Sequence, residues 1–507
     1  MDKPFDILSE SVLYDQMDFD EEFIKDLKMK HRIIIDSLPT VNPPNLYHDS
    51  GYVMIGGGRY TWFAFLAIQA LRRTGSKLPV ELMIPNDDDW ESWLCDEVLP
   101  NQYNVKCVTF SSIYGEEMLK KVEELKGYQF KSFALLGSSF ENAFYLDSDD
   151  FAVKNPDVLF ESDLYKKYQM ITWPDFWRRT SSPSLYSVLG IKVGSVPIRC
   201  LNDLFTPVEK YTTKNDLVAV EERVNYHDRR GTLMDWSTES GQFLFNKTLH
   251  FNTLLLSLYY NYDGPAGYHP LISQGGAGEG DKETYTLAAH YLKKMYYQVY
   301  KKPDKLYGTF IKASNWYVDS TIVQMDPLVD YENLKKLIMK NRASQDEGKE
   351  YTYNYEYAYG SIASSGSFNS EPMFYHIHAP KMDPFEYVNK NLFTNMKDQP
   401  IRNFGYDFPK IGFDIELWIW KTVLESLCER SHDEQFSCFE GANLTIICSN
   451  PLVESRISWL EETGIPMLHD YQRQNFPESP KLTEVEGKDL DDLIYGKLED
   501  SLDFGYL

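Results

Sequence analysis

The most informative part of the sequence is the stretch Ala143-Phe144-Tyr145-Leu146-Asp147-Ser148-Asp149-Asp150. Its apolar residues run directly into three carboxylates, the pattern of a buried strand whose end presents several oxygen atoms to one point. Hard divalent cations such as Mn²⁺ or Mg²⁺ prefer oxygen ligands and keep positions open for phosphate oxygens. Aspartates after a strand are also common turn formers, so the motif alone leaves both interpretations open. Ligands gather at the carboxyl ends of parallel strands, and this position favours a metal site.

The residues before this stretch alternate between strand and helix patterns. Residues 52–55 form a short apolar run closed by three glycines, and residues 60–73 carry apolar side chains at helical spacing. Further strands are predicted at 80–84 and near 105–110. This alternation predicts an α/β fold with a mostly parallel, Rossmann-type sheet flanked by helices.

Composition and charge limit the partners. The chain has 507 residues, 43% hydrophobic and 15% aromatic, which indicates a folded protein rather than a disordered one. The formal net charge of −25 argues against a nucleic acid or an anionic membrane surface as the main partner. A neutral glycan is compatible with this charge. An anionic nucleotide donor would need a local exception made by a metal ion and a few Lys or Arg side chains.

Four regions are predicted along the chain. They are a helical lead-in at 1–45, a nucleotide-binding type of lobe at 46–180, a helix-rich lobe for the acceptor at 181–400, and a C-terminal helical subdomain with an acidic tail at 401–507. Within the third region, residues 240–260 and 282–300 are expected to be helices. Residues 342–369 are expected to form an exposed excursion, and the acidic residues 484–503 a solvated end.

The run from Gly51 to Thr180 resembles the fungal α-mannosyltransferases that branch cell-wall mannan. The segments that carry the resemblance are Ile55-Gly56-Gly57-Gly58-Arg59-Tyr60, Leu71-Arg72-Arg73, Leu78-Pro79-Val80-Glu81, Phe130-Lys131-Ser132, Ser138-Ser139-Phe140-Glu141, Tyr145 to Asp150 and Trp173 to Thr180. Later similar segments are Glu239-Ser240-Gly241-Gln242, Ser273-Gln274-Gly275 and Gly278 to Thr284. The resemblance covers most of residues 50–390.

This resemblance implies a GT-A-type fold, a divalent metal such as Mn²⁺, GDP-mannose as donor, and retention of the α configuration. The acceptor would be a mannose oligosaccharide or the outer-chain mannan of an N-glycan. The glycine-rich segments are most similar to members that add α-1,2 branches to an α-1,6-mannose backbone. Alternatives are an α-1,3- or α-1,2-extending enzyme of the same family, or a non-catalytic glycan-binding protein on this fold. A glycosidase with paired carboxylates would leave the glycine turn and the strand-to-carboxylate motif unexplained.

The resemblance assigns Asp147 and Asp149 to the metal and diphosphate site. Asp150 stands where many relatives carry Asn, and could instead cap the following turn. A late histidine often completes such metal sites. His376 matches the expected position, while His378 is a departure that shares its strand face. The two histidines could also be a hydrogen-bonded structural pair.

The donor is expected to lie against Gly56, Gly57, Gly58 and Arg59, because glycines let the backbone approach a nucleotide closely. The alternative is that these glycines only turn the chain. Lys131 could offset donor charge, or it could be a solvated surface residue. Lys381 is expected to reach the diphosphate.

Glu239, Gln242 and Asp175 are predicted to lie at the transferring sugar. A group under the β face of the mannose is needed either as a nucleophile or to stabilise positive charge, and a carboxylate or carboxamide suits both roles. Glu239 could instead belong to a capping segment that opens a helix at Ser240. Trp173 and Trp177, which flank Asp175, could line the sugar pocket or pack at the sheet edge.

The six cysteines form no metal-type pair, and an even number in a luminal protein allows disulfides. A bond between Cys438 and Cys448 is expected from their short separation. Two sequons, at Asn246 and Asn443, are typical of secreted chains but also occur by chance. No apolar run approaches a membrane span. The resemblance implies a type II protein of the Golgi, so we expect a soluble luminal piece whose N-terminal anchor lies outside this sequence.

Overall fold

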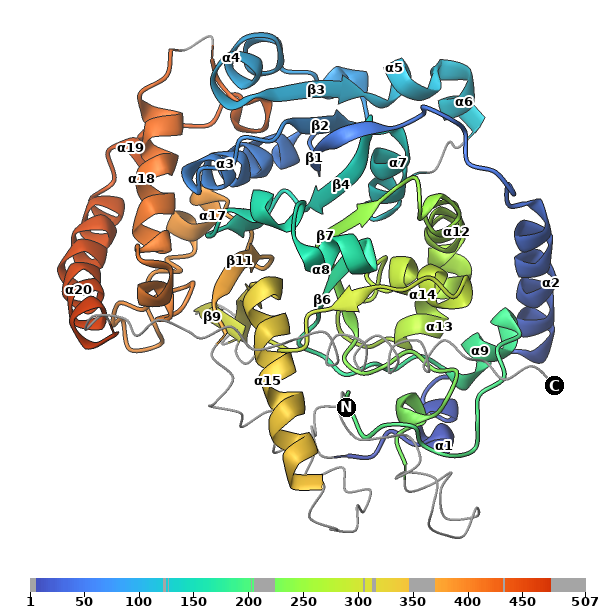
Figure 1. Ribbon diagram of the computed structural model, residues 1–507. Coiled ribbons are helices and arrows are strands. Elements are labelled where there is room, and N and C mark those ends of the chain that lie inside the picture. Colours follow the sequence, from blue (N-terminus) through green and yellow to red (C-terminus); the bar gives the residue numbers. More distant parts are fainter. Residues whose placement is uncertain are drawn as a thin grey trace.

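The computed structural model describes residues 6–121, 125, 127–201, 203–204, 224–303, 306–311, 316–345, 370–431 and 434–475. Its centre is a seven-stranded sheet in the order β3-β2-β1-β4-β7-β6-β8, and a four-stranded sheet has the order β5-β11-β10-β9 (Figure 1). The strands are β1 His48–Ile55, β2 Val80–Ile84, β3 Val105–Thr109, β4 Phe140–Leu146, β5 Asp150–Ala152, β6 Met170–Pro174, β7 Thr238–Asn246, β8 Tyr297–Gln298, β9 Leu306–Ile311, β10 Trp316–Met325 and β11 Pro372–Ile377.

Helices surround these sheets. They are α1 Glu10–Tyr14, α2 Glu21–Ser37, α3 Arg59–Arg73, α4 Leu99–Tyr103, α5 Phe110–Tyr114, α6 Glu116–Lys121, α7 Gln129–Gly137, α8 Asp163–Tyr168, α9 Pro183–Leu189, α12 Phe251–Tyr262, α13 His269–Ser273, α14 Thr284–Tyr291, α15 Pro327–Gln345, α17 Pro384–Asn389, α18 Ile415–Cys428, α19 Thr445–Cys448 and α20 Pro451–Asn475. Among the described residues, no helix is both long enough and apolar enough to cross a bilayer.

The large sheet is mostly parallel, as the alternation of strands and helices predicted. β1 pairs in parallel with β2 and with β4, β2 pairs in parallel with β3, and β6 pairs in parallel with β8. β7 runs antiparallel to both β4 and β6. Its amino end therefore lies at the edge of the sheet where β4 and β6 finish.

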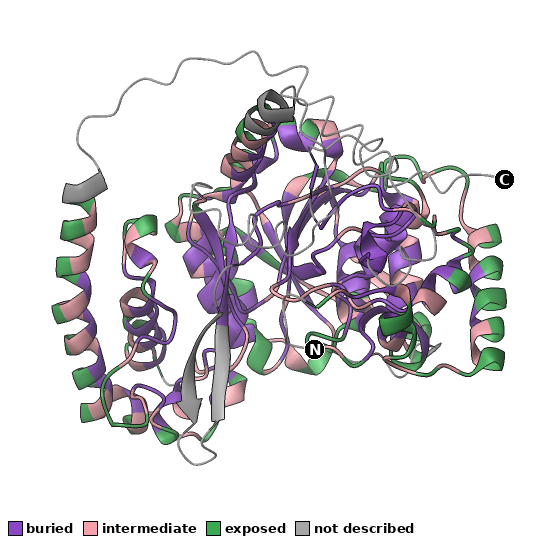
Figure 2. Ribbon diagram, turned by 90° about the horizontal axis from the view of Figure 1, so that it is seen from below, coloured by how far each residue is buried: buried purple, intermediate pink, exposed green. Residues whose placement is uncertain are grey.

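Alternate side chains of the central strands enter two different cores, as the two-residue period of a strand requires. Tyr52 and Phe144 belong to the larger core, which also holds the apolar face of α3. Val53 and Tyr145 belong to the core that includes residues of α7, α12 and α14. Figure 2 shows that buried residues are concentrated in these central layers. Both faces of β1 and β4 are covered, which explains their continuous apolar sequence.

The expected helix at 240–260 is wrong in its first half. The structure has the strand β7 over Thr238–Asn246, and only then the helix α12 over Phe251–Tyr262. The small polar residues that resembled a helix start are the buried beginning of β7 instead. The expected helix at 282–300 is shorter than predicted, because α14 ends at Tyr291 and β8 follows.

Two disulfides are present among the described cysteines, and neither is the expected one. Cys95 pairs with Cys107, and Cys428 pairs with Cys448, while Cys438 and Cys200 belong to neither disulfide. The expected bond between Cys438 and Cys448 is therefore wrong. Cys428 and Cys448 are the last residues of α18 and α19, and this helix pairing brings their sulfur atoms together.

The N-terminal residues are packed onto the body of the protein rather than extended from it. Leu8 donates its backbone N–H to Asn225 Oδ1 at 2.9 Å, and apolar residues of α2 share a core with α9, α12 and α13. The predicted excursion starts in α15, but its residues 346–369 lie outside the described residues, as does the acidic tail at 484–503.

Candidate active site

Two carboxylates and one imidazole come together at the carboxyl end of β4. Asp147 and Asp149 follow the strand directly, and His376 is near the end of β11. One ligand atom from each of the three residues lies within 4.8 Å of the other two. The backbone fixes this arrangement, because Asp147 N–H donates to Gly241 O at 2.7 Å and Ile377 N–H donates to Asp149 O at 2.9 Å.

The donor atoms of this cluster suit a divalent cation. Two carboxylates and one imidazole are ligands that Mn²⁺ accepts. Burial alone would raise the pKa of Asp149, but Lys381 and His376 lower it below its ordinary value, so this carboxylate is ionised. His378 does not join the cluster, although its ring centroid is 5.6 Å from that of His376. Of the two candidate histidines, the structure brings His376 to the aspartates.

Lys131 is buried below Asp147 and is not a surface residue. It comes from α7, is 4% exposed, and its Nζ lies 3.2 Å from Asp147 Oδ2 and 3.1 Å from Asp281 Oδ2. Nζ also donates to Ser240 O at 2.7 Å. Burial opposes the charge, but the two carboxylates raise the pKa of Lys131 above its ordinary value, so it stays protonated. Its geometry fits holding Asp147 in place.

Lys381 lies on the other side of the cluster and binds Asp149 Oδ2 with its Nζ. It is partly exposed, with 29% of its side chain accessible, and a phosphate oxygen could therefore approach it. Asp281 was not singled out from the sequence, although it lies in the glycine-rich segment that resembles the family. An acidic residue between a glycine and a lysine gave no separate signal of a buried ion pair.

Glu239 and Gln242 lie on β7 at the same edge of the sheet. Glu239 Oε1 is 3.2 Å from His376 Nδ1 and accepts the Gly241 N–H at 2.9 Å. Burial opposes ionisation, but His376 lowers the pKa of Glu239 to about 2. A Cβ atom on Gly241 would lie 2.7 Å from His376 Nδ1, so a glycine is needed for this close approach.

Gln242 is fully buried, and both polar atoms of its side chain lack a hydrogen-bond partner among the described residues. The two oxygen atoms of the Asp150 carboxylate also lack a hydrogen-bond partner among the described residues. Burial raises the pKa of Asp150 well above its ordinary value. Asp150 begins β5, where it pairs with His376, and is not a helix cap. Unpaired buried groups of this kind cost free energy and are concentrated at functional sites.

Asp175 follows β6 and forms an ion pair with Lys282, with 2.7 Å between Oδ2 and Nζ. Burial raises the pKa of Asp175, and the charge on Lys282 opposes this effect. The two neighbouring tryptophans, Trp173 and Trp177, differ in exposure. Trp173 is completely buried and donates its ring N–H to Met325 O at 2.7 Å, whereas Trp177 is half-buried and lines a pocket. Trp173 therefore packs the sheet, and only Trp177 is available to a ligand.

The three glycines close β1 and lead into α3. Gly57 and Gly58 have φ angles of +105° and +52°, in the region that favours glycine, and a Cβ atom on Gly57 would lie 3.0 Å from Asp89 Oδ2. Arg59 is exposed at the first position of α3. The turn therefore requires glycine at positions 57 and 58 for backbone reasons. The N–H groups of Gly56 and Gly57 are used within the protein, by Met83 O and Thr61 Oγ1.

The cluster of carboxylates, histidine and lysines lies at the carboxyl ends of strands of an α/β sheet, where such folds bind their ligands. Residues 49–326 match the family described as "Mannosyltransferase putative". The chain is 37% identical over 396 residues to α-1,2-mannosyltransferase MNN2 of Candida albicans, which covers 76% of this chain and 59% of that protein. It is 34% identical over 492 residues to α-1,2-mannosyltransferase MNN23 of the same organism, covering 90% of this chain and 78% of that one.

The chain belongs to this mannosyltransferase family, which confirms the predicted resemblance, and the mostly parallel sheet flanked by helices confirms the predicted α/β fold. The α-1,2-mannosyltransferase MNN5 of Saccharomyces cerevisiae is 36% identical over 75% of this chain and 66% of its own length. Among solved structures, the mannosyltransferase Ktr4p from S. cerevisiae is 12% identical over 55% of this chain and 80% of that chain, with a TM-score of 0.29. A structural similarity this low supports no functional comparison between the two proteins.

Proposed function

We propose that the protein is a retaining α-mannosyltransferase that moves mannose from GDP-mannose to a mannan-type glycan and makes α-1,2 branches on an α-1,6-mannose backbone. The observation that carries the proposal is the cluster of Asp147, Asp149 and His376 at the carboxyl edge of the sheet, in a chain of the mannosyltransferase family. The relatives named above are α-1,2-mannosyltransferases, which supports the linkage. A location in the Golgi lumen is part of the proposal.

In this proposal Asp147, Asp149 and His376 would hold Mn²⁺, and the ion would supply positive charge that offsets the charge of the diphosphate. The partly exposed Lys381 would contact the same diphosphate. The buried Lys131 would hold Asp147 in position through their ion pair. The glycine turn and Arg59 lie against the nucleoside. Residues 46–180 would supply Asp147, Asp149 and most strands of the large sheet, while His376 and Lys381 would come from residues 181–400.

The reaction breaks the bond between the anomeric carbon and the diphosphate, with its electron pair going to GDP, and forms a bond to the acceptor hydroxyl, whose proton passes to the departing diphosphate. Positive charge develops at the anomeric carbon. An ionised Glu239, held by Gly241 N–H and by His376, is suited to stabilise that charge, with Gln242 beside it on β7. Asp175 would orient the sugar from the end of β6.

Incubation with GDP-mannose, Mn²⁺ and α-linked mannose oligomers tests the proposal. NMR of the product should show a new α-1,2 linkage, and GDP should be released in equal amount. Chelation with EDTA should stop the reaction, and Mn²⁺ should restore it. Oligomannose binding without GDP release would instead identify a non-catalytic glycan-binding protein. Mannan hydrolysis without GDP-mannose would indicate a glycosidase.

A further inference from the structure

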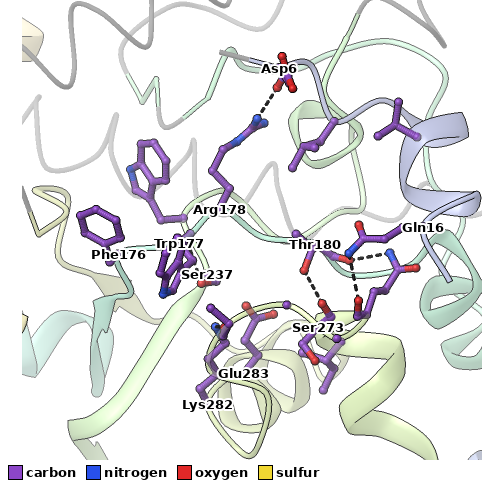
Figure 3. Close-up of a pocket in the computed structure, with 18 of the residues that line it drawn as sticks. Asp6, Gln16, Phe176, Trp177, Arg178, Thr180, Ser237, Ser273, Lys282 and Glu283 are labelled. Carbon is purple, nitrogen blue, oxygen red and sulfur yellow. Dashed lines mark hydrogen bonds between the residues drawn. The ribbon is translucent and has the colours of Figure 1, made fainter. Parts of the chain in front are cut away.

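A pocket of about 870 Å³ opens next to the ion pair of Asp175 and Lys282 (Figure 3). Most of its lining comes from three segments that are distant in sequence: residues 6–16, residues 176–180 after β6, and residues 272–283. Trp236, Ser237 and Lys302 complete it. The first wall includes α1. A pocket of this size can hold more than one hexose, since ligand pockets span roughly 300–1,000 Å³.

One wall of the pocket is aromatic. Phe176 and Trp177 are both half-buried and line it, and their rings pack edge to face with centroids 5.1 Å apart. The opposite wall carries Val12 of α1, which is 46% exposed. A flat, half-exposed aromatic ring provides apolar area at low entropic cost, and the apolar face of a pyranose matches it.

Three charged side chains of the lining are in ion pairs within the protein, Lys302 lies over the rings of Phe176 and Trp236, and Asp6 is exposed to solvent. Lys282 binds Asp175, Glu283 binds Arg179, and Arg178 binds Asp235 with 3.4 Å between Nε and Oδ2. The pocket therefore favours a neutral ligand over a phosphorylated or acidic one.

Two side-chain amides in the wall have unused hydrogen-bonding capacity. The Oε1 atoms of Gln16 and Gln274 are buried and lack a hydrogen-bond partner among the described residues. Their amide nitrogens are used, because Gln16 Nε2 donates to Gln274 O and Gln274 Nε2 donates to Thr180 O. Hydroxyl groups of a sugar are the donors that these oxygens lack.

Residues of the pocket wall contact residues of the candidate active site. Ser237 and Lys282 line it, Asp175 N–H donates to Ser237 O at 2.7 Å, and Glu239 follows Ser237 by two residues. Residues 275–277 add only two glycines and an alanine to the wall, so a sugar ring can approach the backbone there. An oligosaccharide in the pocket would thus present one end to Asp175 and Glu239.

We propose that this pocket binds the acceptor oligosaccharide, with the Trp177 ring under one mannose unit and residues 8–16 of the N-terminal segment as its outer wall. The proposal rests on the proposed function and adds the acceptor site to it. The predicted helical lead-in is, on this view, part of the substrate site. Its attachment supports this role, since Glu10 binds Arg229 and Leu8 is hydrogen-bonded to Asn225.

Steady-state kinetics with an α-linked mannotetraose test the proposal. Trp177→Ala should raise the KM for the tetraose about tenfold, which corresponds to about 1.4 kcal/mol, and leave the KM for GDP-mannose near the wild-type value, because the variant removes the apolar ring proposed to lie under one mannose unit. With a single mannoside as acceptor, the ratio of variant to wild-type KM should be smaller. An unchanged KM for the tetraose would overturn the proposal.

A second pair of variants avoids the risk that Trp177→Ala disturbs folding. Val12→Trp places a large side chain into the pocket from the exposed side of α1, whereas Tyr14→Trp changes an exposed residue of the same helix that does not line the pocket. Calorimetric titration with mannotetraose should show weaker binding for Val12→Trp and unchanged binding for Tyr14→Trp. Equal affinities in both variants and wild type would contradict the proposal. This titration needs no turnover, so it tests whether the pocket binds the oligosaccharide even if GDP-mannose is not the donor.

Discussion

His376 Nδ1 lies 3.2 Å from Glu239 Oε1, and the other nitrogen of the same ring, Nε2, lies 3.6 Å from Asp149 Oδ1. One imidazole therefore connects the carboxylate proposed to face the sugar with a carboxylate proposed to hold the metal. Partners of this kind orient a metal-binding histidine and fix its tautomer. The contact also requires Gly241, because a side chain at that position would meet the ring.

Glu239→Gln should reduce kcat on the order of a hundredfold with little change in the KM for GDP-mannose, because the variant loses a charge that stabilises the transition state. Gln242→Ala should have a similar effect if its amide faces the sugar. Thermal unfolding of the purified variants is the control. Normal turnover per folded molecule, combined with a lower melting temperature, would mean that Glu239 only maintains the strand.

Asp149→Ala and Asp147→Ala should abolish transfer while leaving the protein folded. Mn²⁺ should raise the melting temperature of the wild type, by the equivalent of about 2.7 kcal/mol at a hundred times its Kd, and should not raise that of the variants. Asp36→Ala, which removes an exposed carboxylate of α2, is the matched control and should behave as wild type. Transfer within a few-fold of wild type in both site variants would rule out the proposed metal role.

Alkylation of the denatured, non-reduced protein should label two thiols, Cys200 and Cys438. Removing the bond between Cys428 and Cys448 by a double alanine substitution should lower the free energy of unfolding by about 3 kcal/mol, the typical effect of closing a loop of this length. Cys438→Ala should change it little. Labelling of four or more thiols would contradict the pairing, and urea titration measures the change in stability.

The sequence predicted β4 and its carboxylates correctly because a continuous apolar run and the following aspartates give one consistent signal. It failed at residues 240–260, where a strand and a helix follow each other after only four residues, Lys247 to His250. Both elements are apolar, so their combined pattern resembled one helix. No local pattern distinguishes a buried strand from a buried helix here.

Contacts between distant segments could not be predicted from local patterns. The ion pairs of Lys131 with Asp281 and of Asp175 with Lys282 join residues more than a hundred positions apart. The disulfide partner of Cys448 likewise depends on how α18 packs on α19. The prediction of Cys438, which is nearer in sequence, was therefore wrong.

Stability should decrease as the pH falls from about 6.5 to about 4, in part because of His31. This residue of α2 is 3% exposed, its Nε2 lies 2.9 Å from Tyr260 OH, and burial lowers its pKa to about 4. In the unfolded chain its pKa is about 6.5, so between these values only the unfolded state binds the proton, which costs up to about 3 kcal/mol of stability. His31→Gln should flatten this dependence in urea titrations, whereas His48→Gln, at an exposed position, should not. An unchanged slope for His31→Gln would contradict the assignment.

The two sequons should differ in glycosylation when the protein passes through a secretory pathway. Asn246 is 8% exposed at the end of β7, where Nδ2 donates to Asn142 Oδ1 and Oδ1 accepts the Leu249 N–H. A hydrophilic glycan has no space there. Asn443 is exposed, and its Oδ1 accepts bonds from Thr445, the third residue of its own sequon.

Thr445→Ala should therefore abolish the mobility shift that an endoglycosidase produces on the secreted protein, because it removes the acceptor sequence at Asn443. Thr248→Ala is the matched control. It removes the other sequon by the same substitution and leaves the side chain of Asn246 and its two hydrogen bonds intact. The shift should persist in this variant. Loss of the shift in Thr248→Ala, with retention in Thr445→Ala, would mean that the end of β7 is accessible to the modifying enzyme and that Asn246 is not held as the structure shows.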